Sequence, residues 1–266
     1  MHSDIPPLLT VGLVFYNTEK TMANAIKSVL MQSFTDFEMI LIDDGSNDGS
    51  YKIAEEFSRL DSRITLIKGG ENKGVGFRLN QLTDLAKGEY LARMDADDMM
   101  LPGKIEKQME VLLADKNIDL TDCFAYIIDN NDIPAGKRKN NDISNLNLRK
   151  ILKTRTLFFH PTIIAKTSWF RENRYNEDFK RGPDFELWCR TFEKTNYVRI
   201  AEHLFLYREG NVSIRNYKLS SESLRKSLRL YYHNNLSLFE LKKEIFISHL
   251  KTCLYRLFGF LIFSIF

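Results

Sequence analysis

The residues best suited to chemistry are the two carboxylates of the run Asp95-Ala96-Asp97. They directly follow the apolar run YLARM, and Asp98 adjoins them. Carboxylate oxygens on one short turn suit hard divalent cations such as Mg²⁺ or Mn²⁺, and such a cation can bridge to phosphates. A solvated loop is the alternative, because an isolated D-x-D occurs often by chance. The position of the pair at the end of a strand favours a metal site.

A second acidic turn, Asp43-Asp44-Gly45-Ser46, follows another apolar run. It brings backbone amides and a carboxylate to the end of a strand, which suits the hydrogen-bond donors of a nucleoside base. Ser46 or Asp48 can instead cap the next helix, which is the commoner use of such residues. We therefore expect one carboxylate to contact a ligand and the other residues to form the turn and the cap.

The loop Asn72-Lys73-Gly74-Val75-Gly76 has glycines but lacks the spacing of either standard phosphate-binding fingerprint. A turn with a structural glycine is the simpler interpretation. Arg78, just inside the next expected helix, can reach a phosphate or a base.

These residues are positioned by strand-like and helix-like segments that alternate over the first ~115 residues, a pattern typical of a parallel sheet flanked by helices. Both acidic turns follow expected strands, so both can face one crevice at the carboxyl ends of the sheet. Beyond Asp119 the alternation of strand-like and helix-like segments becomes less regular. Strands are expected at 8–16, 38–42, 64–67, 89–94 and 121–128, and a strand or a short turn at 160–165. Helices are expected at about 18–32 (capped by Thr18), 49–59, up to 87, 102–114 (opened by Pro102), 146–153 and 183–194.

Composition excludes several classes of protein. The 266 residues are 44% hydrophobic and carry a formal charge of only +3, which argues against disorder and against a nucleic-acid partner. Three cysteines without metal-ligand spacing make a disulfide framework unexpected. The N-terminus lacks the pattern of a secretory signal, so we expect a cytoplasmic protein.

The C-terminal segment combines basic and apolar residues. The run LFGFLIFSIF has about ten residues, fewer than the ~20 that span a bilayer. Lys242, Lys243, Lys251 and Arg256 accompany apolar residues, which favours an amphipathic helix on the inner face of the cell membrane. A helix packed on the core is the alternative.

Several motifs in order resemble the family 2 glycosyltransferases of the GT-A fold, from about Leu9 to Tyr207. They are VGLVFYN, SVLMQSFTDFEMILIDDGSNDGS, NKGVGFRLN, GEYLARMDADDMMLPGKIEKQ, HPTIIAK and PDFELWCR. The resemblance is to members that build surface polysaccharides, such as O-antigen, capsule or exopolysaccharide. It implies an α/β fold with a Rossmann-like, mainly parallel sheet and a helical C-terminal extension.

The implied activity is a metal-dependent, inverting transfer from a nucleoside diphosphate sugar, expected to be a UDP-sugar, to a hydroxyl of a saccharide or lipid-linked glycan. Mn²⁺ or Mg²⁺ is the expected cofactor. The implied domains are a catalytic domain at 1–215, with a nucleotide-sugar half (1–118) and an acceptor half (119–215), and a C-terminal segment at 216–266.

The resemblance also implies roles for single residues on the donor side. Asp97 matches the main metal ligand, and Asp95 contacts ribose or metal. The expected nucleotide-sugar contacts are Phe15, Tyr16, Asn17, Asp44, Arg78 and Asp95.

Asp184 matches the catalytic base of the family, with Leu187 and Trp188 in register, although Pro183 stands where the family usually has Glu. Proline at the first turn places Asp184 near a helix N-terminus, where the macrodipole favours an ionised carboxylate. Helix capping by Asp184 is the alternative.

Three further contacts to the acceptor or the diphosphate are implied, at His160, Trp188 and Arg208. Arg208 lies with Tyr207, Ser213 and Arg215 in a segment that resembles the one closing over the diphosphate in relatives, although a solvated loop is an alternative.

Two rival functions stay open. A sugar nucleotidyltransferase needs a glycine-rich basic loop after the first strand, where this chain has Tyr16-Asn17-Thr18-Glu19. A non-catalytic nucleotide-sugar-binding or membrane-adaptor protein would bind donor without transfer.

Overall fold

The computed structural model describes residues 6–138, 147–154, 158–209, 213–232 and 236–258. The chain forms two compact units. The first comprises Met1–Asn140, Phe158–Arg174 and Thr195–Glu209, and the second comprises Asn141–Leu157, Tyr175–Lys194 and Gly210–Phe266. The described residues 147–154 and 175–194 are therefore grouped with the C-terminal helices. The extent of the catalytic domain stays a prediction.

The first unit is built on one mixed sheet, which has nine strands within the described residues, and its order along the main path is β3-β2-β1-β4-β8-β6-β9-β5, with β7 paired to β6. The first four strands on this path are parallel, which confirms the expected α/β sheet. Their bounds are Leu9–Phe15 (β1), Phe37–Asp43 (β2), Ile64–Ile67 (β3) and Tyr90–Asp95 (β4). The other strands are Met99–Met100 (β5), Leu120–Ile128 (β6), Pro134–Arg138 (β7), Ile164–Lys166 (β8) and Tyr197–Arg208 (β9).

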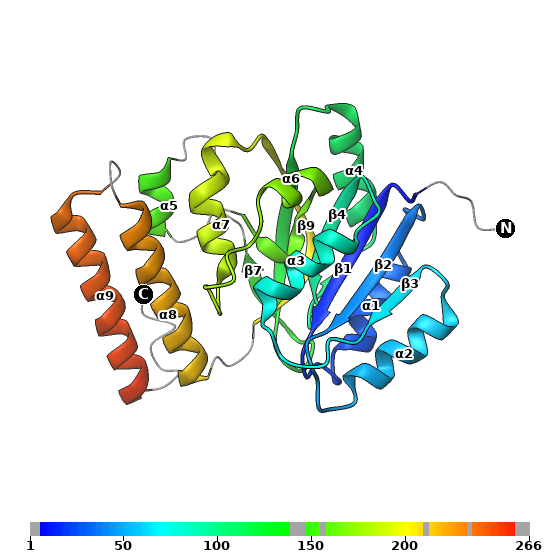
Figure 1. Cartoon of the computed structure of the whole chain (residues 1–266), viewed down its shortest axis with the longest axis horizontal. Helices are drawn as coiled ribbons and strands as arrows, with labels where there is room; N and C mark the ends of the chain where they lie inside the picture. Colours follow the sequence, from blue (N-terminus) through cyan, green and yellow to red (C-terminus); the bar gives the residue numbers. More distant parts are fainter. Residues whose placement is uncertain (1–5, 139–146, 155–157, 210–212, 233–235, 259–266) are drawn as a thin grey trace. The chain divides into compact units, whose positions relative to one another are not determined.

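Helices cover both faces of this sheet. Figure 1 shows α3 in front of the parallel strands and α1 behind them, and α3 contacts α6. The helices of this unit are Met22–Leu30 (α1), Ser50–Leu60 (α2), Val75–Leu85 (α3), Lys104–Ala114 (α4) and Thr167–Glu172 (α6), with a short 3₁₀ turn at His160–Thr162.

The second unit is helical in its described part. Helix α8 (Ile214–Tyr231) contacts both α7 (Pro183–Thr191) and α9 (Leu238–Phe258), and α5 (Leu148–Thr154) contacts α7. A 3₁₀ turn at Phe192–Lys194 follows α7. The expected helical C-terminal extension is therefore confirmed, and residues 259–266 of the apolar terminal run lie outside the described residues.

The parallel strands are apolar on both faces, as expected of a sheet covered on both sides. Gly12 in β1 is required by close packing, because a Cβ at this position would lie 2.1 Å from Leu82 Cδ2 of α3. The approach of α3 to the sheet therefore depends on a residue without a side chain.

Two sequence predictions about the starts of helices were wrong, and one long strand was missed. Helix α1 begins at Met22 and not at Thr18, because the Thr18 carbonyl accepts from the amides of Thr21 and Met22 at 3.0 Å and closes a separate turn. Helix α4 begins after Gly103, whose φ of 76° is left-handed, so Pro102 lies outside the helix. The twelve-residue strand β9 was not predicted.

Lys104, at the start of α4, is a charged residue in the core. Its side chain is 0% exposed, its Nζ has no hydrogen-bond partner among the described residues, and it lies 5.8 Å from the centroid of the Phe205 ring. Burial lowers the pKa of this amine from 10.5 to about 8, partly offset by Cys123 and Asp122. A drop of this size corresponds to about 3 kcal/mol of lost stability for the charged form.

We expect Lys104→Met to stabilise the fold at pH 7 by about 1 to 3 kcal/mol, since it fills the same space without a buried charge. Because the folded-state pKa is lowered, wild-type stability rises as the pH goes from about 8 toward 10.5, and the advantage of the variant shrinks there. Urea unfolding at pH 7 and pH 9.5 measures both effects. A variant less stable than wild type at pH 7 would show that the ammonium group is stabilising.

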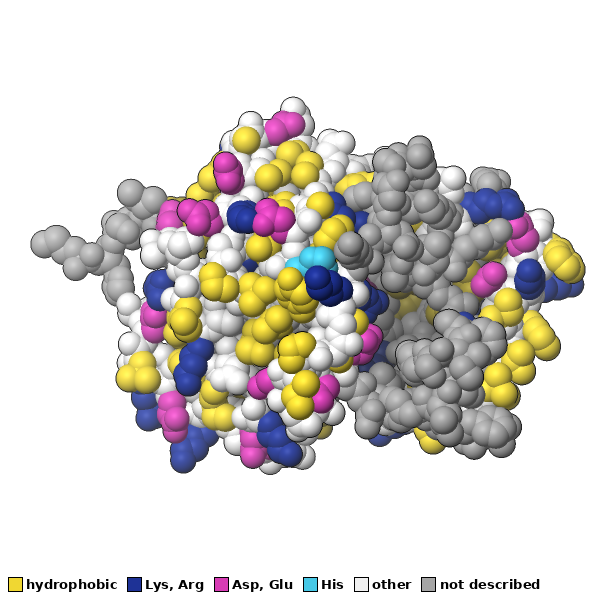
Figure 2. Space-filling model, turned by 180° about the vertical axis from the view of Figure 1, so that it is seen from behind, with side chains coloured by type: hydrophobic (Ala, Val, Ile, Leu, Met, Phe, Trp, Pro, Cys, Tyr) yellow, Lys and Arg dark blue, Asp and Glu magenta, His cyan; other side chains and the backbone are white. Residues whose placement is uncertain are grey.

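The surface carries mixed charge. On the face shown in Figure 2, Lys and Arg lie among Asp and Glu over the described residues, and hydrophobic side chains lie between them. Among the described side chains of helix α9, the exposed large hydrophobic ones are Leu238, Phe239, Phe246 and Leu250.

Candidate active site

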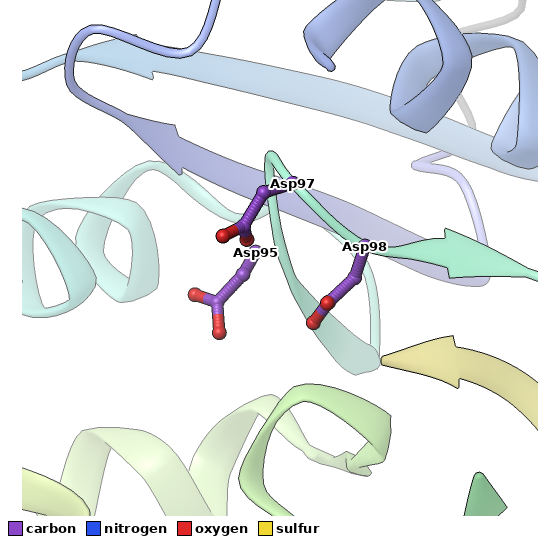
Figure 3. Close-up of side chains that lie close together, drawn as sticks. All are labelled: Asp95, Asp97 and Asp98. Carbon is purple, nitrogen blue, oxygen red and sulfur yellow. The ribbon is translucent and has the colours of Figure 1, made fainter. Parts of the chain in front are cut away.

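The acidic turn at the carboxyl end of β4 gathers three carboxylates. Asp95 is the last residue of β4, and Asp97 and Asp98 lie in the turn before β5. One oxygen from each carboxylate lies within 4.8 Å of the other two, and Figure 3 shows the three side chains on the same side of the turn. Their exposure differs, since Asp98 is 1% exposed whereas the Asp95 side chain is 37% exposed.

Arg93 orients the first of these carboxylates. Its Nη1 donates to Asp95 Oδ2 at 3.1 Å and its Nη2 donates to Asp95 Oδ1, so the pair is bidentate. The two side chains share a side of β4 because they are two residues apart in a strand. Arg93 is 3% exposed, so this is a buried guanidinium that fixes the direction of Asp95. Sequence analysis missed Arg93, although the two-residue spacing was its signal.

The hydrogen-bond partners of the Asp98 carboxylate indicate whether the turn can hold a cation. Its Oδ1 accepts from the Arg208 amide at 2.8 Å, while its Oδ2 is buried and has no hydrogen-bond partner among the described residues. Burial, and then the charges of Asp95 and Asp97, raise the pKa of Asp98 well above its usual range. A buried oxygen without a donor is costly, and a cation held by oxygen ligands would satisfy it. The donor set therefore fits Mg²⁺ or Mn²⁺.

The pKa of the Asp97 carboxyl is raised as well. Burial raises the pKa of its carboxyl to about 6, with a further contribution from the charge of Asp95. Protonation and cation binding compete at such a group, because the ligand must be ionised.

We therefore expect the affinity for Mn²⁺ to fall as the pH drops through about 6, where Asp97 takes up its proton. The sign follows from the raised pKa, since the ionised form predominates only above it. Titration of the protein with Mn²⁺ at pH 5, 6, 7 and 8, followed by electron paramagnetic resonance of the free ion, measures the effect. An affinity that does not change between pH 5 and pH 7 would contradict it.

Arg208, at the end of β9, holds the acidic turn in place. Its Nε donates to the Asp97 carbonyl at 2.8 Å and its Nη1 donates to the Asp129 carbonyl at 2.5 Å, while Nη2 contacts Asp132. Its guanidinium is thus directed to the turn and to the β6–β7 connection. Arg208 was expected to contact the diphosphate, and that role stays a prediction.

Asp44 and Arg78 form a second buried pair. Asp44 accepts from the amides of Lys73 and Gly74 at 2.8 and 3.0 Å and from Arg78 Nε at 2.8 Å. Arg78 Nη2 donates to the carbonyls of Gly69 and Glu71 at 2.8 and 2.7 Å. The pair therefore fixes the loop 69–74 against the end of β2, at a place where sequence analysis expected a nucleoside base.

The rest of the expected base pocket lies at the end of β1. Phe15 is buried, whereas the Tyr16 side chain is exposed and available to a flat ligand. Asn17 has a φ of 54°, and its Oδ1 accepts from the Asn47 amide at 2.9 Å. Asp48 accepts from the Ser50 amide at 3.0 Å, but the N-cap of α2 is Gly49, so neither Ser46 nor Asp48 occupies the expected cap position.

His160 and Arg138 lie in the surroundings of the acidic turn. Burial, and then the charge of Arg93, hold the pKa of His160 well below 6.5, so its imidazole is neutral. Arg138 lies over the rings of Phe159 and Tyr207, at 5.0 and 5.5 Å from their centroids. Burial, and then the charge of Asp98, raise the pKa of the Tyr207 phenol. Arg138 is a cation of this region that sequence analysis missed.

The second unit carries Asp184 in the first turn of α7. Gly182 precedes the helix with a φ of 62°, and Pro183 is its first residue. The half-buried carboxylate lies where the helix dipole favours its ionised form. Trp188, an expected acceptor contact, is 2% exposed and lies in the interior of the unit.

Glu186 is a further carboxylate of α7 that sequence analysis missed. It accepts from Arg190 Nε at 3.0 Å and from the Tyr231 hydroxyl at 2.5 Å. Because Glu186 is 2% exposed and accepts from Tyr231 of α8, it joins α7 to α8.

The known proteins that this chain resembles share one description. Residues 10–178 match the family model described as glycosyl transferase family 2. An uncharacterized glycosyltransferase of Methanocaldococcus jannaschii is 31% identical over 208 residues, covering 77% of this chain and 72% of the relative. The O-antigen biosynthesis glycosyltransferase WbnJ of Escherichia coli is 26% identical over 255 residues, covering 94% of both chains.

Solved structures share the fold. TarS 1–349 of S. aureus in complex with UDP-GlcNAc has a TM-score of 0.64 at 17% identity, covering 95% of this chain and 76% of that one. The mannosyltransferase PcManGT from Pyrobaculum calidifontis, in complex with GDP-Man and Mn²⁺, has a TM-score of 0.63 at 13% identity, covering 94% and 70%. The expected GT-A fold is thereby confirmed, and with the match over residues 10–178 the chain belongs to the family 2 glycosyltransferases.

Proposed function

We propose that this glycosyltransferase moves a sugar from a nucleoside diphosphate sugar, with UDP as the expected nucleotide, to a hydroxyl of a saccharide or lipid-linked glycan, with inversion. The observation that carries the proposal is the acidic turn, in which Asp98 keeps a buried oxygen without a hydrogen-bond partner among the described residues. A divalent cation held by such a turn would offset the negative charge of the donor's diphosphate. The relative WbnJ is described as an O-antigen biosynthesis glycosyltransferase, which supports a role in a saccharide pathway. The structural neighbour TarS was solved in complex with UDP-GlcNAc, which supports a UDP-sugar as donor.

The residues proposed to bind the donor lie in the first unit. Tyr16 offers an exposed ring at the end of β1, and Asp44 and Arg78 hold the neighbouring loop in one conformation. Asp95, Asp97 and Asp98 would hold Mn²⁺ or Mg²⁺. When bound, such an ion offsets the negative charge that grows on the departing diphosphate.

Asp184 is the proposed general base that acts on the acceptor. Its carboxylate takes the proton of the acceptor hydroxyl as the oxygen forms its bond to the anomeric carbon. The bond from that carbon to the diphosphate oxygen breaks in the same step, and its electron pair leaves with the diphosphate. A single displacement of this kind inverts the configuration at the anomeric carbon.

Release of nucleoside diphosphate tests this function. Purified protein is supplied with a panel of UDP-, GDP- and dTDP-sugars and with saccharide or glycolipid acceptors, with Mn²⁺, with Mg²⁺ or with a chelator. We expect release from one class of donor, dependent on metal and stimulated by acceptor. Donor binding without release under every condition would contradict the proposal and favour a non-catalytic binding protein.

We also propose that α9 contacts a membrane surface. Phe239, Phe246 and Leu250 are exposed together with Lys242 and Lys243, at spacings of three or four residues that place them on one side of the helix. In the described part of the chain, no helix has both the length and the apolar character to cross a bilayer. Sedimentation with anionic and with neutral vesicles, comparing wild type with Phe246→Glu, tests the contact.

A further inference from the structure

A cavity between the first turn of α7 and helix α8 lies beside the proposed base. Its volume is ≈ 250 Å³, and Gly182, Phe185, Tyr217 and three serines of α8 line it. All of these residues belong to the second unit. We propose that this cavity binds a sugar ring of the acceptor, an inference that rests on the proposed function and names a site for its second substrate.

The lining has the chemistry that a sugar needs. Ser220, Ser221 and Ser223 line the cavity, and their hydroxyls form no hydrogen bond with other described residues. A hydroxyl both donates and accepts, as the hydroxyls of a sugar do. The half-buried ring of Phe185 adds a flat apolar wall, and ligand sites typically combine apolar walls with a few polar groups.

Asp184 lies next to two residues that line the cavity, Gly182 and Phe185. A Cβ built on Gly182, which lines the cavity, would lie 3.8 Å from Asp184 Oδ1. Phe185, the next residue after Asp184, lines the same cavity. A general base must lie within about 2.6–3.2 Å of the oxygen whose proton it takes. A ring held against Gly182 and Phe185 would therefore lie beside the proposed base.

The size of the cavity favours one ring. Pockets for drug-sized ligands measure about 300–1,000 Å³, so ≈ 250 Å³ suits a monosaccharide unit. A neighbouring cavity of ≈ 180 Å³ shares Ser223 and is lined by Asp178, Lys180, Glu222 and Lys226. A second, polar or charged unit of the acceptor fits there, so the end of an oligosaccharide is favoured over a free monosaccharide.

The test uses the full chain and a panel of simple probes: the methyl glycosides of glucose, galactose, mannose and N-acetylglucosamine. Saturation-transfer NMR reports their binding without donor or metal. We expect at least one glycoside to bind wild type, and Ser223→Phe, which fills the cavity, to weaken it at least tenfold. The double variant Ser220→Ala, Ser223→Ala removes hydroxyls without adding volume and is expected to weaken binding in the same direction.

Arg229→Phe is the matched control, since it adds the same ring to an exposed position of α8 outside both cavities, and it is expected to bind as wild type does. Circular dichroism shows whether each variant is folded. If no glycoside binds wild type, or if the serine variants bind as wild type does, the cavity is not an acceptor site. This outcome is separate from failure of the proposed function, which shows as absence of donor turnover in wild type.

Discussion

Asp184→Asn is expected to reduce the transfer rate by ~10²–10⁴-fold while leaving donor affinity within about twofold of wild type. Asparagine keeps the size of the side chain but cannot accept the proton of the acceptor hydroxyl. The donor contacts proposed above belong to the other unit, so the substitution separates binding from chemistry. Steady-state release of nucleoside diphosphate gives the rate, and calorimetry with the intact donor gives the affinity.

Glu193→Gln is the matched control for this experiment. It also replaces a carboxylate by an amide, at an exposed position just after α7, and is expected to leave the rate unchanged. An Asp184→Asn variant that transfers at the wild-type rate would remove Asp184 as the base. A variant that has lost donor binding would show that Asp184 contributes to the donor site.

The parallel half of the sheet was predictable because its signals are local. Each of β1 to β4 is a short apolar run, and the acidic turn of Asp95 to Asp98 directly follows β4 in sequence. Parallel strands place their carboxyl ends at one edge, so the approximate place of the turn followed as well.

Strand β9 was missed for the opposite reason. It pairs in parallel with β6 and antiparallel with β5, strands that lie about 70 to 100 residues earlier in the chain. Such pairings depend on tertiary contacts that no short window of sequence contains. The grouping of 175–194 with the C-terminal helices is equally non-local, since it depends on contacts such as Tyr231 with Glu186.

The partners of the arginines could not be predicted from the sequence. From residue type, Arg78 was expected to contact a phosphate or a base and Arg208 the acceptor or the diphosphate, whereas Arg93 was missed. In the structure each is almost fully buried against a carboxylate or a backbone carbonyl. Residue type gives the chemistry that a side chain can perform, whereas burial and geometry decide which partner it takes.

Asp97→Asn is expected to lower transfer by about 10²–10⁴-fold in saturating donor at low Mn²⁺, because it removes a proposed ligand of the ion. A metal contributes several kcal/mol of transition-state stabilisation, and each 1.36 kcal/mol is tenfold in rate. Excess Mn²⁺ is expected to restore part of the rate, since Asp95 and Asp98 remain. Asp36→Asn, which changes an exposed carboxylate elsewhere in the same unit, is expected to keep the wild-type response to Mn²⁺.

The unfolding temperature, measured with and without Mn²⁺, distinguishes a metal-ligand role of Asp97 from a structural one. The raised pKa of Asp97 means that its ionised form is disfavoured by burial and by Asp95 in the folded protein. Asp97→Asn is therefore expected to unfold at the same or a higher temperature than wild type without metal. Wild type is expected to gain stability on addition of Mn²⁺, by ligand linkage, and the variant is expected to gain less. A variant that is less stable without metal, yet gains as much from Mn²⁺ as wild type, would make Asp97 a structural residue of the turn and leave the ion to its neighbours.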